Sequence, residues 1–363
     1  WSESLEACSF MTHRFKRVAI RNSLLLLMIL VGMSIARSSP AGATLSTTTY
    51  TTPTPTTFSL DLTSGPNETM WFTKISEHQV VKLLTDGSMT EYTIPLHNTG
   101  ATLTVAMHMA MGKDENMWFG TCEVDYSNGG DAVTNYLNKI TETGVITSYA
   151  VLVNPNNPSS WAGCIQSVTS GTDGNLWISG GNDDEGSYGF VAKATTSGTI
   201  SQVYEYPGAA WIYAIKADAD GNVWYPRPDN AHITKKTPAG VDVEYSLPDG
   251  YIDAYGASEG FNGDMWFTVL KAHEKNKTGL VRISALGEVT LYPTDGDMVV
   301  YSVAKGLNGD MWFGSAQSRI GKIDKDGQMS FYALPDTNSG SSSILLGPDN
   351  NIWVVEVDLS TFK

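Results

Sequence analysis

One short phrase is the key to the fold: Asn308-Gly309-Asp310-Met311-Trp312-Phe313, in which a turn leads to a tryptophan between apolar residues. A tryptophan in an apolar phrase of this kind occurs seven times in the chain. Successive tryptophans are separated by 47, 59, 47, 42, 46 and 41 residues. A period of this length fits a unit of four short strands, so the sequence predicts an all-β, seven-bladed β-propeller with four-stranded antiparallel blades. The seven phrases are Met70-Trp71-Phe72, Met117-Trp118-Phe119, Leu176-Trp177-Ile178, Val223-Trp224-Tyr225, Met265-Trp266-Phe267, Met311-Trp312-Phe313 and Ile352-Trp353-Val354.

Turn residues divide each repeat into strands. A Gly/Asp/Asn turn such as Asp218-Ala219-Asp220-Gly221-Asn222 precedes most of the tryptophans and is expected to close a hairpin. We interpret these turns as structural and not as calcium loops, because the downstream bidentate Glu of a calcium loop is missing. A phrase that ends in proline, such as Gly327 to Pro335, closes most repeats and is typical of an outer edge strand.

The N-terminal part of the chain carries an export signal. Residues 11–43 contain a basic start, an apolar run from Leu24 to Ile35 and the small residues Ala41-Gly42-Ala43, a pattern that predicts a signal peptide cut after Ala43. Residues 1–10 form an upstream segment of no clear role. We therefore expect a secreted, extracellular protein with no membrane span in the mature chain.

Closure of the ring is expected to involve both ends of the chain. Residues 44–57 are rich in threonine and proline, and they fit either an outer strand that closes the ring or a flexible linker. The propeller is expected over residues 58–363. Only ten residues follow Trp353, so we expect the last blade to be incomplete, with a third strand beginning at Ser360 to Lys363.

The net charge of the chain limits the kinds of molecule that it can bind. The formal net charge is −15 at pH 7, which argues against nucleic acid and against an anionic membrane surface. The chain is expected to be a monomer.

Cys122 and Cys164 fall at neighbouring positions of adjacent predicted blades, so we predict a disulfide between them.

The repeated turn and tryptophan strand, followed by Ile320-Gly321-Lys322-Ile323 and the phrase Gly327 to Pro335, resemble the virginiamycin B lyase (streptogramin lyase) family over about residues 46–357. The resemblance implies a seven-bladed propeller and a magnesium-assisted elimination that opens a cyclic depsipeptide at its threonyl ester. In that family two carboxylates hold the metal, and a histidine in a Glu-Pro-His triplet of the last blade is the base.

This chain departs from the family at those positions. Gly340-Ser341-Ser342 stands where Glu-Pro-His is expected, and Tyr301 stands where a substrate histidine is expected. Glu356 is the one remaining candidate for a metal ligand, so magnesium is expected only if the protein is a lyase. His108, on the inner strand of the second blade, is expected to point into an interface between sheets.

Aromatic residues, and not the catalytic residues of the family, are expected at the central opening. The position eleven residues before the tryptophan is expected to line the central opening, and it holds Gln166, Tyr213, Tyr255 and Tyr301, with Trp211 nearby. Lys74, Arg227 and Glu356 lie three residues after their tryptophans. Lys74 and Glu356 fall on adjoining predicted blades, and pairing with each other is the alternative to a role in binding.

Two functions fit these residues. The first is binding of a small molecule, glycan or peptide at a tyrosine-lined mouth, near which the long insertions at residues 122–131, 154–163 and 182–186 are also expected. The second is a carbon–oxygen lyase with Tyr301 or Tyr255 as base and Glu356 as metal ligand. As a third, purely structural, interpretation, the tyrosines fill a narrow axial tunnel.

Overall fold

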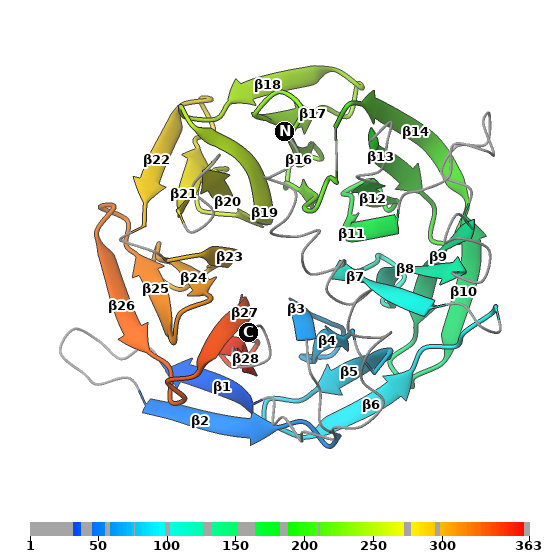
Figure 1. Cartoon of the computed structure of the whole chain (residues 1–363), viewed down its shortest axis with the longest axis horizontal. Helices are drawn as coiled ribbons and strands as arrows, with labels where there is room; N and C mark the ends of the chain where they lie inside the picture. Colours follow the sequence, from blue (N-terminus) through cyan, green and yellow to red (C-terminus); the bar gives the residue numbers. More distant parts are fainter. Residues whose placement is uncertain are drawn as a thin grey trace.

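The computed structural model describes residues 32–37, 46–54, 59–75, 77–98, 102–125, 132–151, 164–181, 188–209, 211–271, 277–294 and 298–358. Within these residues all regular structure is β-strand, and the strands form four-stranded antiparallel sheets arranged radially around a central axis (Figure 1). The prediction of an all-β propeller is therefore confirmed. No helix among the described residues is long and apolar enough to cross a membrane.

Six of the sheets are each built from four consecutive strands, and the chain passes from the inner strand to the outer strand before it enters the next sheet. The first three comprise β3 (Ser59–Ser64), β4 (Met70–Lys74), β5 (Gln79–Leu83) and β6 (Met89–Thr93); β7 (Thr102–Met111), β8 (Met117–Asp125), β9 (Ala132–Ile140) and β10 (Ile146–Val151); and β11 (Cys164–Ser170), β12 (Leu176–Gly181), β13 (Tyr188–Ala194) and β14 (Ile200–Pro207).

The next three sheets continue the ring in the same order. They comprise β15 (Lys216–Ala217), β16 (Val223–Arg227), β17 (His232–Lys236) and β18 (Asp242–Ser246); β19 (Tyr251–Glu259), β20 (Met265–Lys271), β21 (Thr278–Ile283) and β22 (Val289–Pro293); and β23 (Val300–Lys305), β24 (Met311–Ser315), β25 (Arg319–Ile323) and β26 (Met329–Ala333).

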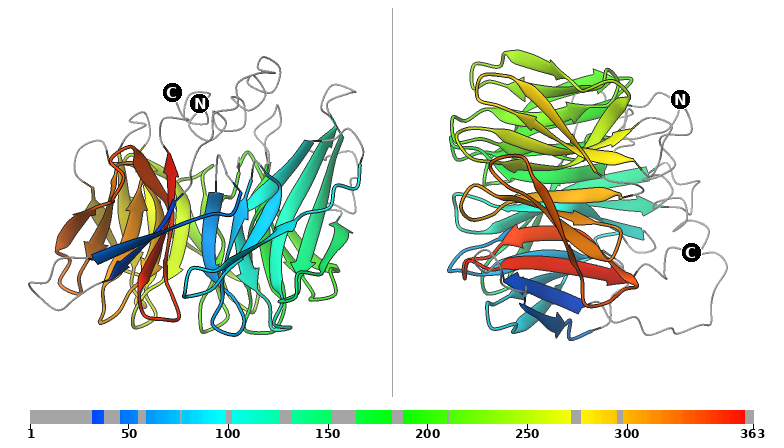
Figure 2. Two further views of the ribbon diagram at one scale, coloured as in Figure 1. Left: turned by 90° about the horizontal axis from the view of Figure 1, so that it is seen from below. Right: turned by 90° about the vertical axis from the view of Figure 1, so that its left-hand side faces the viewer.

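One further four-stranded sheet combines the two ends of the chain, and we call it the composite sheet. Its order from the inside is β27 (Ser339–Leu346), β28 (Ile352–Asp358), β1 (Gly32–Arg37) and β2 (Ser46–Thr51). Figure 2 shows the blue N-terminal strands beside the red C-terminal strands. An outer strand within residues 44–57 is therefore present. The third strand comes from residues 32–37, inside the predicted signal peptide, whereas Ser360 to Lys363 lie outside the described residues.

The repeated tryptophan is a packing residue, and its turn holds it in place. Trp118 is fully buried, and its indole Nε1 donates to Asp114 at 3.0 Å. Trp224 donates in the same way to Asp218 at 2.7 Å. The Asp of the turn therefore binds the indole and the turn backbone, which is the structural role expected for it.

In each sheet a row of three residues on adjacent strands begins at the tryptophan. The first member is the tryptophan itself, and the third is a tyrosine of the outer strand whose ring stacks on it, at 5.4 Å between centroids for Trp312 and Tyr332. In the six consecutive sheets the second member is basic, whereas in the composite sheet Ile35 is paired with Trp353. The basic pairs are Trp71 with Lys82, Trp118 with Lys139, Trp177 with Lys193, Trp224 with Lys235, Trp266 with Arg282 and Trp312 with Lys322.

Candidate functional site

The inner strands are irregular where they pass the axis. The register of β3 shifts between Leu60 and Leu62, and that of β7 shifts between Val105 and Met109. Comparable shifts occur in β11, β19, β23 and β27. A bulge interrupts the strict alternation of side chains, so residues near it point in directions that counting by twos does not give.

The residue ten positions before the tryptophan links neighbouring sheets. Ser343 Oγ accepts a hydrogen bond from the backbone N–H of Leu62 at 2.9 Å, and Ser167 Oγ accepts one from Ile215 at 3.3 Å. Asp61 has the same place in β3, and its Oδ2 accepts the N–H of Met109 at 2.6 Å. A carboxylate therefore replaces a hydroxyl at this link, and it has a second oxygen to offer.

That second oxygen contacts a histidine. Asp61 Oδ1 lies 3.3 Å from His108 Nδ1, and the other ring nitrogen of His108 lies 3.2 Å from the backbone carbonyl of Tyr255. Tyr255 belongs to β19, which faces β7 across the centre of the ring (Figure 1). His108 thus contacts the neighbouring sheet through Asp61, in line with the prediction that it points into a sheet interface, and it also contacts β19, which the sequence did not predict.

Asp61 keeps this position at some conformational cost. Its φ angle is +49°, in the left-handed region that non-glycine residues seldom adopt. Backbone strain of this kind persists only where surrounding contacts hold it, and it is concentrated at functional sites. The side chains of Asp61 and His108 are 14 % and 26 % exposed, so solvent reaches both.

Aromatic rings continue from Tyr255 away from the histidine. The ring centroids of Tyr213 and Tyr255 lie 5.2 Å apart, and the ring of Trp211 stacks on Tyr213 at 6.2 Å. Tyr213 and Tyr255 are only 5 % and 8 % exposed, whereas Trp211 is partly exposed. We call Asp61, His108, Trp211, Tyr213 and Tyr255 the axial cluster.

The other two residues of the predicted mouth lie on β11 and β23. Gln166 is buried, at 7 % exposure. Tyr301 is partly buried, and its backbone carbonyl lies so close to Gly256 that a Cβ there would be 2.7 Å from it. Among the expected aromatic residues, Trp211 and Tyr301 thus keep exposed surface, while Tyr213 and Tyr255 are buried.

Asp253 is a residue that the sequence analysis missed. It lies on β19 two residues before Tyr255, where it is partly buried, and its Oδ1 accepts the N–H of Ala254 at 2.7 Å. Burial raises the pKa of its carboxyl from 3.8 to about 7, and the single hydrogen bond offsets only part of that effect. A carboxyl that titrates near neutrality can take up or release a proton under physiological conditions.

Neither of the predicted cations faces the axis freely. Lys74 has no exposed side-chain surface, and its Nζ donates to Glu91 at 2.9 Å and to the carbonyl of Thr54 at 3.0 Å. Lys74 is thus paired with Glu91 of its own sheet and not, as the sequence suggested, with Glu356. Arg227 donates through Nε and Nη2 to Asp229, and its guanidinium lies 4.1 Å from the centroid of the Tyr206 ring.

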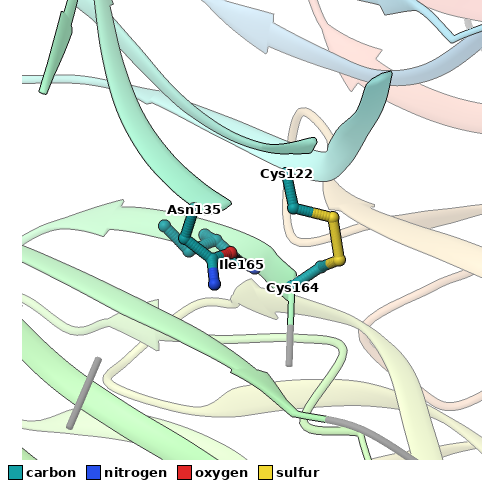
Figure 3. The surroundings of a disulfide bond; sticks show 4 residues. All are labelled: Cys122, Asn135, Cys164 and Ile165. Atoms are coloured by element: carbon teal, nitrogen blue, oxygen red, sulfur yellow. Dashed lines mark hydrogen bonds between the residues drawn. A yellow bond between two sulfur atoms is a disulfide. The ribbon is translucent and has the colours of Figure 1, made fainter. Parts of the chain in front are cut away.

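The predicted disulfide between Cys122 and Cys164 is confirmed. It joins β8 to the first residue of β11, with 5.5 Å between the two Cα atoms, and thus ties two adjacent sheets (Figure 3). Beside it, the side-chain oxygen of Asn135 accepts the N–H of Ile165 at 3.1 Å. Most of the inserted loops around this bond, including residues 126–131, 152–163 and 182–187, lie outside the described residues.

Comparison with known proteins identifies the family to which this propeller belongs. The family model described as the virginiamycin B lyase family matches residues 160–361, which is more than half of the chain. The chain belongs to the virginiamycin B lyase family. A search of curated proteins found no match.

Solved structures of virginiamycin B lyases share the fold. A streptogramin B lyase is 23 % identical over 90 % of this chain and 95 % of that chain, with a TM-score of 0.65. Virginiamycin B lyase from Staphylococcus aureus is 21 % identical over 83 % and 95 %, with a TM-score of 0.62. A catalytically inactive variant of the latter with quinupristin is 22 % identical over 82 % and 94 %, with a TM-score of 0.61.

The described residues do not offer the magnesium site that virginiamycin B lyase chemistry implies. Magnesium is held by oxygen ligands from carboxylates in near-octahedral geometry. Within the part of the chain that the structure describes, no three His, Cys, Asp or Glu side chains gather at a common point. Glu356 is 4 % exposed and lies opposite Ser341 in the register of β27 and β28, and the described residues Gly340 to Ser342 supply neither a carboxylate nor a histidine.

Proposed function

We propose that this protein is an exported propeller that binds a small molecule, glycan or peptide at the axial cluster. The composite sheet would serve as the seventh blade that closes the ring, so that the inner strands hold the cluster rigidly. Export follows from the leader pattern in residues 11–43, and the single disulfide is compatible with an oxidising compartment.

The observation that carries the proposal is the joining of Trp211, Tyr213 and Tyr255 to a polar pair across the axis. Trp211, held by stacking on the buried Tyr213, provides exposed apolar surface. Asp61 and His108 provide directional polar groups, of which His108 contacts the backbone of Tyr255. Ligand sites of proteins combine these two features, and the centre of a propeller is a usual place for them.

The proposal is tested by titrating the protein with quinupristin, oligosaccharides and short peptides in a calorimeter. We expect at least one class to bind, and Trp211→Ala to weaken that binding about tenfold, because it removes an aromatic face. Phe261→Ala is the matched control, since Phe261 is a partly buried aromatic in a turn between β19 and β20, away from the axial cluster. Equal losses in both variants would argue against an axial site.

A second candidate is a carbon–oxygen lyase. Family membership and the direction of His108 favour it, because an imidazole aimed at the axis is a better base than the buried ring of Tyr255. Incubation with quinupristin, with and without magnesium, would yield a linear isomer of unchanged mass if elimination occurs. Loss of that product in Glu356→Gln would restore a role for Glu356, and an unchanged substrate would exclude this reaction.

A further inference from the structure

A serine and a histidine lie in hydrogen-bond contact at the outer rim of the ring, away from the axial cluster. Ser246 belongs to β18, the outermost strand of its sheet, and His232 lies directly opposite it on β17 (Figure 1). Ser246 Oγ is 3.0 Å from His232 Nε2. Ser246 is exposed and His232 is partly exposed, so a molecule from solvent can reach both.

The second ring nitrogen of His232 is held by the backbone. Nδ1 contacts the carbonyl oxygen of Asn230, which accepts hydrogen bonds and has no proton to donate. Nδ1 therefore carries a proton, and in the neutral ring Nε2 is the acceptor. The hydroxyl of Ser246 donates to Nε2, which is the direction needed for the imidazole to take the serine proton.

The equivalent positions of two other sheets pair different side chains, namely Gln79 with Thr93 in the first sheet and Arg319 with Ala333 in the sixth. A backbone hydrogen bond between the adjacent residues of the ladder marks the equivalence. It joins Leu247 to Ala231, Ile94 to His78 and Leu334 to Ser318. The sheet therefore forms without a histidine opposite a serine, and packing alone does not account for the pair in the fourth sheet.

The free edge of β18 supplies a backbone donor beside the serine. The N–H of Leu247 donates to Ala231 on β17, and in an antiparallel ladder the N–H of the next residue along the strand points to the opposite side. Among the described residues no further strand of this sheet lies on that side, because β18 is the outermost. The N–H of Ser246 is thus directed away from the sheet, where it can donate to an oxygen that becomes negative during a reaction at its own side chain.

We propose that Ser246 is a nucleophile with His232 as its general base, and that this pair hydrolyses neutral esters independently of the axial cluster. Oγ bonds to the ester carbonyl carbon as its proton passes to Nε2. The tetrahedral intermediate then expels the alkoxide, which takes the proton from Nε2 and leaves as an alcohol. Water attacks the acyl-serine, and its proton passes through Nε2 to Oγ, so that a carboxylic acid leaves and the hydroxyl is restored.

The charges around the pair favour a neutral ester. Glu244 lies two residues before Ser246, so it projects from the same face of β18. Arg227, opposite His232 on β16, lies 2.7 Å from Asp229 and 3.7 Å from Glu244. Two carboxylates thus outnumber the one cation of this group, and an acyl chain with its own carboxylate would meet like charge.

The test is reaction of the full chain with p-nitrophenyl acetate and with a fluorophosphonate probe, with the modified residue located by peptide mass spectrometry. We expect both reagents to modify Ser246, and Ser246→Ala to abolish that modification. His232→Gln should slow it about a hundredfold, the contribution of a general base, and the first sheet already carries Gln79 at the equivalent position. Ser201→Ala is the matched control and should react as the unchanged protein does, because Ser201 is an exposed serine of outer strand β14 whose hydroxyl donates to a backbone carbonyl.

The remaining outcomes would overturn the inference. Modification of Ser246 at an unchanged rate in His232→Gln would make it an ordinary surface hydroxyl, and modification of other residues only, or of none, would leave no nucleophile at this rim. The mono-p-nitrophenyl ester of succinic acid should react more slowly than the acetate, and a faster reaction would overturn the preference for neutral esters. Circular dichroism checks that each variant is folded.

Discussion

Asp253 gives a direct test of the electrostatics near the axis. Its pKa of about 7 means that the folded protein holds the proton more tightly than the unfolded chain does. The resulting stability is present below pH 4 and is lost as the pH rises to about 7. A shift of about three units corresponds to about 4 kcal/mol, and we expect about half of it, since Asp253 is partly exposed.

Asp253→Asn should therefore stabilise the protein by about 2 kcal/mol at pH 8 and change little at pH 4, as measured by urea unfolding at both pH values. The amide keeps the oxygen that accepts the N–H of Ala254. Asp249→Asn is the matched control, because Asp249 is exposed just before the same strand. A gain that is equal at both pH values would contradict the burial argument.

Lys74 and Glu91 form a second testable pair. Burial opposes ionisation of Glu91, but hydrogen bonds from Lys74 and Thr54 outweigh it and lower its pKa. Because the pKa is lowered, this contribution to stability is present above the ordinary pKa of Glu91, 4.5, and is lost as the pH falls through the folded value.

Glu91→Gln should cost about 3 kcal/mol at pH 7, since it leaves the charge of the buried Lys74 without its partner. The more exposed pair of Lys82 and Glu142 provides the control, and Glu142→Gln should cost less than about 1 kcal/mol. Thermal and urea unfolding measure both changes. Similar costs for the two variants would mean that Lys74 finds another partner or reaches water.

Individual site residues were only partly predictable from the sequence. Spacing from the tryptophan correctly selected Tyr213 and Tyr255 as residues near one another, because one inner strand per repeat passes the axis. It did not predict the contact of His108 with Tyr255 and did not identify Asp61 or Asp253. The direction of these side chains depends on bulges and on contacts from sheets far apart in the sequence, neither of which has a local signal.

The strands themselves were predictable because their signals are local. A buried tryptophan after a turn recurs in each repeat, and in several repeats a turn side chain accepts its indole N–H, so seven tryptophan strands follow from seven phrases. The outer strand β2 was also predictable from its terminal proline. The third strand of the composite sheet was not, because residues 32–37 have the composition of a leader peptide.

The disulfide joins two of these elements, and its removal should be costly. It closes a loop of 42 residues between β8 and β11, for which the chain-entropy relation gives about 4 kcal/mol. The double variant Cys122→Ser/Cys164→Ser should lower the free energy of unfolding by about that amount in urea titrations. Dithiothreitol should lower the stability of the unchanged protein to the same level and leave the double variant unaffected. An effect of dithiothreitol on the double variant would show a different cause.

At the level of the whole ring, the predicted cleavage of the signal peptide is incompatible with the composite sheet as the structure shows it. Cleavage after Ala43 would remove β1 from its place between β28 and β2. Ile35 stands opposite Trp353 in that strand, whereas the six consecutive sheets place Lys or Arg opposite their tryptophans. Lys363 follows Trp353 by ten residues, as Lys322 follows Trp312.

This spacing leads to a prediction for the mature ring. In a protein that starts at Thr44, we expect residues 359–363 to supply the third strand, with Lys363 opposite Trp353. A chain of residues 44–363 should then melt within a few degrees of the full chain, while one of residues 44–358 should melt about 5 °C lower or more, since β28 loses its neighbour. Lys363→Ala tests the basic member of the row alone. Equal melting temperatures for the two shortened chains, both well below that of the full chain, would instead make residues 32–37 the native third strand and place the end of any leader peptide before Gly32.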